Sequence, residues 1–147
     1  MRERLHDENG AAVIEFVSIT VLLLIPALYL IATLFSMQAA TFAAEGTARE
    51  VARIMSEARS EDSARAHAQA VAQMSAHDLG LDADDVELSI TCSTASCTDP
   101  KAYIDVVVTV DQPLPLIPMF LADRLGSRVS IAANAVGVAN PYLERGP

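Results

Sequence analysis

Apolar residues are concentrated in one long run near the N-terminus of this 147-residue chain, and further along they alternate with polar residues in shorter segments. Residues 16–35 carry no charged side chain. About 20 consecutive apolar residues form a helix long enough to cross the hydrocarbon core of a bilayer. We therefore predict a transmembrane helix over residues 11–37, in which Pro26 introduces a kink of the kind that membrane helices tolerate.

The apolar pattern continues beyond this span with steps of three and four residues. Its members are Ala44, Ala48, Val51, Met55 and Ala58. This spacing predicts that the helix extends through residues 38–59 with one apolar face.

Small residues recur at every fourth position of the same segment, at Ala32, Ser36, Ala40 and Ala44. Small side chains at this spacing let membrane helices approach each other closely. We interpret the four residues as a packing seam for a partner helix. The alternative is that an alanine-rich sequence produces the spacing by chance.

A second helix is predicted over residues 60–80. Ser60 can cap its N-terminus, and Glu61 and Asp62 in the first turn suit the helix dipole. Gly80 ends the helix, and Leu81 follows in a position that often packs back on the helix end. The apolar side is thin and consists of Ala64, Ala68, Val71, Ala72, Met74 and Leu79.

After Gly80 the apolar period changes from the helical one to two, which is typical of half-buried strands. Three segments show it: residues 86–92, 104–111 and, more weakly, 128–138. The first two are joined by a short loop and predict an antiparallel hairpin. The expected fold class is α+β, with about three antiparallel strands within residues 81–140 packed on a helix, followed by a tail at 141–147.

The segment 112–126 is apolar but contains three prolines, which exclude a regular strand through it. We expect its leucine, isoleucine, methionine and phenylalanine side chains to cap the open end of the core. The alternative is an exposed patch that contacts the membrane or a neighbouring subunit.

The net charge and the distribution of basic residues exclude one class of partner. The formal net charge is −9, and the ten Lys and Arg residues are spread thinly along the chain. Because phosphate binding needs a concentrated basic face, nucleic acid is not an expected partner. The acidic cluster Asp82, Asp84 and Asp85 lacks the glycine and the final carboxylate of a calcium loop, so we interpret it as a solvated turn.

The sequence gives no basis for an enzyme, a metal site, a cofactor or a small-molecule substrate. No nucleophile elbow and no phosphate-binding loop is present. His67 and His77 are ten residues apart on the second predicted helix, too far for a shared metal ion.

The basic residues around the apolar run predict the orientation of the chain. Arg2 and Arg4 precede the run, and the next basic residue is Arg49. The positive-inside tendency then keeps the N-terminus in the cytoplasm and exports the remainder. In an exported domain the closely spaced Cys92 and Cys97 are most simply a disulfide that holds a turn.

The N-terminal run itself allows three interpretations. A cleaved signal peptide is one, but its apolar region is usually only about 7 to 15 residues long. A plain uncleaved anchor is the second. The third rests on a charged leader, residues 1–10, that ends in Gly10 and is followed by Ala11 and then by Glu15 near the front of the apolar helix.

A carboxylate in a membrane helix is costly, so it usually has a partner. Cleavage between Gly10 and Ala11 would create one, because the new amine of Ala11 is a cation at a similar depth. The alternative is that Glu15 lies at the interfacial edge, hydrated and without a role.

The stretch "GAAVIEF" before an apolar helix and a small α+β region resembles the TadE-like pseudopilins of tight-adherence (Flp) pilus assembly, which have a type IV prepilin-like N-terminus. In that family a prepilin peptidase cuts after the glycine, and the glutamate lies at the fifth mature position, here Glu15. Many type IV pilins begin with an aromatic residue, whereas this chain would begin with Ala11. Major Flp pilins lack a sizeable domain after the helix.

The resemblance implies a minor pseudopilin or pilus-assembly accessory protein of a tight-adherence pilus or related secretion system. Its expected partners are the membrane, prepilin peptidase, other pilins or pseudopilins and the assembly machinery. The expected location is the cytoplasmic membrane, with a single span and an extracytoplasmic C-terminal domain. The alternative function is that of an uncleaved, membrane-anchored extracytoplasmic binding protein.

Overall fold

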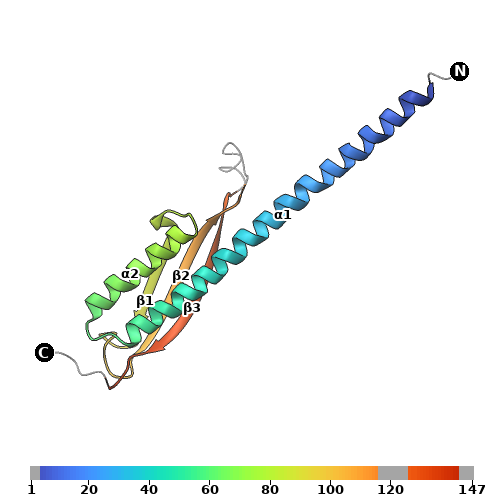
Figure 1. Ribbon diagram of the computed structural model, residues 1–147. Helices are drawn as coiled ribbons and strands as arrows, with labels where there is room; N and C mark the ends of the chain where they lie inside the picture. Colours follow the sequence, from blue (N-terminus) through green and yellow to red (C-terminus); the bar gives the residue numbers. More distant parts are fainter. Residues whose placement is uncertain (1–3, 116–125, 143–147) are drawn as a thin grey trace. The chain divides into compact units, whose positions relative to one another are not determined.

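The computed structural model describes residues 4–115 and 126–142, with side chains from residue 12 onward. The chain divides into two compact units, Met1–Phe35 and Ser36–Pro147. The elements follow in the order α1, α2, a short 3-10 helix η1, β1, β2 and β3 (Figure 1). The predicted α+β class, with two helices followed by a three-stranded antiparallel sheet, is confirmed.

Helix α1 covers Arg4–Ser56 and therefore contributes to both units. It begins before residue 11, where the predicted span starts, and it ends three residues before the predicted end at 59. The end is fixed by a contact with the far end of the chain, because the backbone N–H of Asn140 donates to the Ser56 carbonyl at 2.9 Å. That bond satisfies one of the carbonyls that every helix leaves unpaired at its C-terminus.

Helix α2 covers Glu61–Asp78. Ser60 occupies the N-cap position, but its side chain makes no capping hydrogen bond, so that detail of the prediction is wrong. The C-terminus matches the prediction. Gly80 has a φ of +69°, its N–H donates to the His77 carbonyl, and the N–H of Leu81 donates to the Ala76 carbonyl. This is a Schellman motif, which needs a residue without a Cβ clash at the glycine position.

The side of α2 that is buried consists only of alanines, Ala64, Ala68, Ala72 and Ala76. Val71 is half-buried and Met74 is exposed. The predicted apolar side was therefore right for the alanines and wrong for Met74. Because alanine buries little area, α2 gains only modest hydrophobic stabilisation from this contact.

The sheet consists of β1 (Val86–Cys92), β2 (Tyr103–Pro113) and β3 (Arg128–Val138), with β2 in the centre. Both pairings are antiparallel. The predicted bounds of β1 and β3 are confirmed, whereas β2 begins one residue earlier and ends two residues later than expected. Its last residue, Pro113, stands at the strand end, where a missing N–H costs least.

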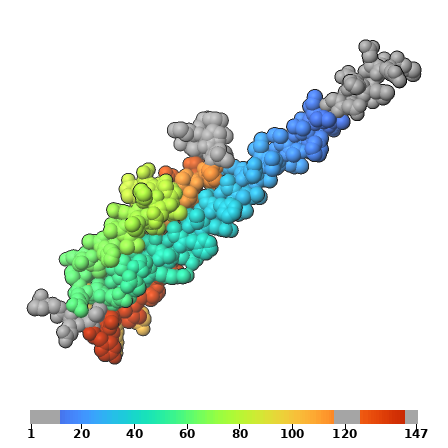
Figure 2. Space-filling view, viewed as in Figure 1, coloured from blue at the N-terminus to red at the C-terminus, as the bar shows by residue number. Residues whose placement is uncertain are grey.

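Both helices of the unit 36–147 cover the same face of the sheet, α2 on the side of β1 and α1 on the side of β3 (Figure 1). Their side chains hide most of the strands in the space-filling view (Figure 2). The centre of the core is formed by four β2 side chains and two from α1, all fully buried: Ile104, Val106, Val108, Val110, Val51 and Met55. Each such side chain contributes on the order of 1.5–3 kcal/mol.

Helix α1 passes close to β3 at Gly137. A Cβ atom on this glycine would lie 2.3 Å from Ser56 Oγ and 2.9 Å from the Ala52 carbonyl oxygen. Only a residue without a side chain lets the helix backbone pass here.

The acidic turn before β1 is the 3-10 helix η1 (Ala83–Asp85). Asp82 and Asp85 form a capping box, and Asp85 also pairs with Arg128 at the start of β3. The turn is therefore tied to the opposite edge strand. Most of the proline-rich segment, 116–125, lies outside the described residues, so its predicted role as a core cap stays a prediction.

Candidate functional site

The predicted processing residues lie within the first turns of α1. The Gly10–Ala11 bond is inside the helix, and Glu15 follows with an exposed side chain. Residues 11 and 15 are four apart in a continuous helix, so they share one face. The N-terminus of a chain that began at Ala11 would therefore lie on the same side of α1 as the Glu15 carboxylate.

The apolar side chains of residues 12–35 are exposed around the helix. They include Phe16, Leu22, Leu23, Ile25 and Phe35, each more than 60% exposed. By length and composition, α1 can cross a membrane once. Two hydroxyls within this segment are satisfied locally, because Thr20 and Thr33 each donate to the carbonyl four residues earlier. The helix runs through Pro26 without interruption, and the kink there stays a prediction.

The predicted packing seam divides into two parts. Ala32 is exposed and Ser36 is half-buried, whereas Ala40 and Ala44 are completely buried within the chain's own domain. The interpretation that Ala40 and Ala44 contact a partner helix is therefore wrong in this fold. Their small size instead lets α1 pack closely within its own unit. A seam for a partner can involve Ala32 and Ser36 only.

The predicted disulfide between Cys92 and Cys97 is present, with the two Cα atoms 5.3 Å apart. It joins the end of β1 to the loop that leads into β2. The two cysteines differ in environment, since Cys97 is 1% exposed and Cys92 is half-buried.

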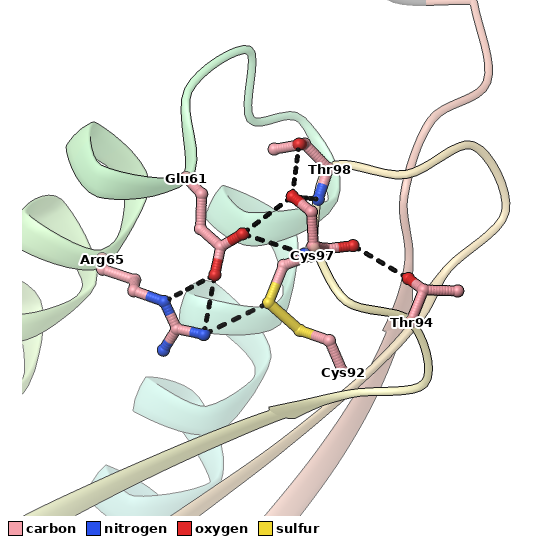
Figure 3. Close-up of polar contacts among 7 residues, drawn as sticks. Glu61, Arg65, Cys92, Thr94, Cys97 and Thr98 are labelled. Atoms are coloured by element: carbon pink, nitrogen blue, oxygen red, sulfur yellow. Dashed lines mark hydrogen bonds and ion pairs between the residues drawn. A yellow bond between two sulfur atoms is a disulfide. The ribbon is translucent and has the colours of Figure 1, made fainter.

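One carboxylate from α2 holds this disulfide loop in place (Figure 3). Glu61 accepts hydrogen bonds from the Ser96 hydroxyl at 2.9 Å and from the Cys97 N–H at 3.0 Å. It is also paired with Arg65 at 2.9 Å, one helical turn further along. We call Glu61, Arg65, Ser96 and Cys97 the loop clasp.

The clasp has a clear electrostatic signature. Its hydrogen bonds favour the charged form of Glu61, so the Ser96 hydroxyl, then Arg65 and the Cys97 N–H, lower the pKa of that carboxyl. The sequence pattern assigned Glu61 only a role at the helix dipole. Its contact with residues 35 and 36 positions away leaves no local signal in a single sequence.

We expect the loop clasp to make the free energy of unfolding of the domain depend on pH in the acidic range. A carboxyl whose pKa is lowered by folding contributes stability that is fully present above its unfolded pKa, about 4.3, and is lost as the pH falls through the folded value. The urea midpoints of the wild type and of Glu61→Gln should therefore differ by a constant amount well above this unfolded pKa and should converge progressively as the pH falls below it. A gap that stays constant down to pH 3 would contradict this.

Among the side chains of residues 12–115 and 126–142, no group of three or more His, Cys, Asp or Glu is placed to hold a metal ion. No protein-family model, curated protein or solved structure matches the chain. The class of this protein therefore rests on its fold and site alone. It is an α+β protein with a disulfide and one N-terminal apolar helix that is long enough to cross a membrane.

Proposed function

We propose that this chain is a TadE-like minor pseudopilin or pilus-assembly accessory protein of a tight-adherence pilus or related secretion system. One observation carries the proposal: Gly10 stands five residues before Glu15 near the start of α1, directly ahead of the part of this helix whose apolar side chains are exposed. The small α+β unit after the helix supports an accessory role, because it gives the chain a folded domain that major Flp pilins lack.

Processing would convert the front of α1 into a charge pair. Prepilin peptidase would cleave between Gly10 and Ala11 and leave a cationic amine at Ala11. A rise of 1.5 Å per residue places residues 11 and 15 about 6 Å apart along the helix axis, with both on one face. As the resemblance implies, the glutamate of one subunit then faces the amine of its neighbour, which lowers the cost of holding either charge in the membrane.

The exposed apolar surface of residues 12–35 supports a location in the cytoplasmic membrane with a single span. Arg2 and Arg4 ahead of this span favour a cytoplasmic N-terminus. Outside the membrane, the disulfide suits an oxidising compartment. In the membrane, α1 would pack with the helices of other pilins, and Ala32 and Ser36 allow a close approach. The extracytoplasmic domain would prime, cap or adapt the filament.

The mature N-terminus tests this proposal. Intact-mass and peptide analysis of the protein from its native membrane should show a chain that starts at Ala11. A chain that still starts at Met1 would instead support the uncleaved membrane-anchored binding protein. A start near Ala44 would identify a signal peptide and exclude both membrane-anchored forms.

A further inference from the structure

The two cysteines of the disulfide lie in different environments. Arg65 Nη2 lies 3.3 Å from Cys97 Sγ and donates a hydrogen bond to it (Figure 3). Cys97 also lies beside the first turn of α2, through the bond from its N–H to Glu61. Cys92, the last residue of β1, is the more exposed of the two. The pair is therefore asymmetric. Cys97 is buried and its sulfur accepts a hydrogen bond from Arg65, whereas Cys92 is half-buried and packs partly against the core.

This asymmetry matters because of how disulfides react. A thiolate attacks one sulfur, a new disulfide forms there, and the other sulfur leaves with the electron pair as a thiolate. The leaving sulfur departs faster when its thiolate is stabilised, and a neighbouring guanidinium provides such stabilisation. Cys92 is the less buried of the two residues, which favours attack there, and Arg65 favours departure of Cys97, so both effects select the same direction.

We propose that Cys92–Cys97 is a directional thiol–disulfide exchange site that reacts with low-molecular-weight thiols. The thiolate attacks Cys92 Sγ, the Cys92–Cys97 bond breaks, a mixed disulfide forms on Cys92, and Cys97 leaves as a thiolate beside Arg65. In the reverse step the Cys97 thiolate attacks Cys92 Sγ and releases the small thiol. Electrons balance in each direction, because one S–S bond replaces another.

The site also controls how firmly α2 is held. The buried side of this helix offers only alanines to the core, whereas the loop clasp joins its first turn to the disulfide loop through Glu61. Opening the disulfide releases the loop from the end of β1 and weakens this attachment. The proposal does not depend on processing at Gly10, so either idea can fail without the other.

Mass spectrometry can identify which of the two cysteines the small thiol attacks. The oxidised full-length protein in detergent is incubated with reduced glutathione, quenched by alkylation, digested and mapped by mass spectrometry. Glutathione should be found on Cys92 and the alkyl group on Cys97. Glutathione on Cys97, or an even distribution between the two cysteines, would overturn the proposal.

Two substitutions separate the chemical role of Arg65 from a purely structural one. Arg65→Gln should slow the formation of the mixed disulfide roughly threefold to tenfold, because the leaving thiolate loses its cation. Glu61→Gln should accelerate it, because the loop is held less tightly and a nearby negative charge is removed. If the clasp only restrained the loop, both variants would react faster, and that outcome would overturn the role of Arg65.

Two controls complete the experiment. Arg59→Gln removes an exposed arginine just ahead of α2 and should leave the rate unchanged. Arg65→Lys keeps the positive charge and should restore part of the wild-type rate. Circular dichroism of every variant establishes that rates are compared between folded proteins, and equal rates for Arg65→Gln and Arg59→Gln would also refute the proposal.

Discussion

Replacing Gly137 by valine is expected to destabilise the domain by about 3 kcal/mol or more, because the new side chain must enter space that α1 already fills. Even the Cβ atom would lie 2.9 Å from the Ala52 carbonyl oxygen, which is backbone and cannot turn away. Valine is otherwise well suited to a strand, so a loss of stability would report on the helix contact alone. Urea unfolding of the full-length protein in detergent, followed by circular dichroism, measures the change.

A matched pair of glycine substitutions provides the control. Gly137→Ala should cost about 1–3 kcal/mol because of the same clash. Gly46→Ala, in α1, places its Cβ in open space and should stabilise the protein by about 0.5–1 kcal/mol. Adding Ser56→Ala to Gly137→Ala should recover part of the loss, since it removes the 2.3 Å contact and leaves the backbone one. Unchanged stability of Gly137→Ala would show that α1 can shift freely on β3.

Replacing Gly10 by alanine is expected to abolish processing, so that only the full-length precursor accumulates in the membrane. The reason is chemical specificity: in the family that this N-terminus resembles, the peptidase cuts after glycine. Alanine also strengthens a helix relative to glycine, which makes the bond harder to open for cleavage. The ratio of the precursor to the chain that starts at Ala11, read by intact mass, gives the result.

Gly46→Ala serves again as the control, because it makes the same change in the same helix away from the cleavage bond and should be processed normally. A companion variant separates cleavage from assembly. Glu15→Gln should still be cut after Gly10 but should crosslink less to neighbouring pilin helices in the membrane. Normal cleavage of Gly10→Ala would refute the processing mechanism.

The regular elements could be predicted because their signals are local. Alternation over residues 86–92 and 128–138 located β1 and β3, and Gly80 located the end of α2. The end of α1 could not be predicted in the same way. Nothing near Ser56 marks it, and the hydrogen bond from Asn140 that satisfies its carbonyl comes from beyond β3.

The same distinction applies to the site. Cys92 and Cys97 were predicted as a pair because their spacing and the expected export suffice, whereas the clasp residues Glu61 and Ser96 meet only through the fold. The misreading of Ala40 and Ala44 has a related cause. A row of small residues predicts close packing but does not say whether the partner is another chain or the same one, and here it is the same one.

The contacts of α1 with Gly137 and Asn140 also set the order in which the domain can form. The first helix of the unit 36–147 receives its final partners from the last strand and the residues just after it. During synthesis the chain therefore lacks those partners until β3 and Asn140 are available. We therefore expect the domain to close only after β3 and the residues just after it have been synthesised.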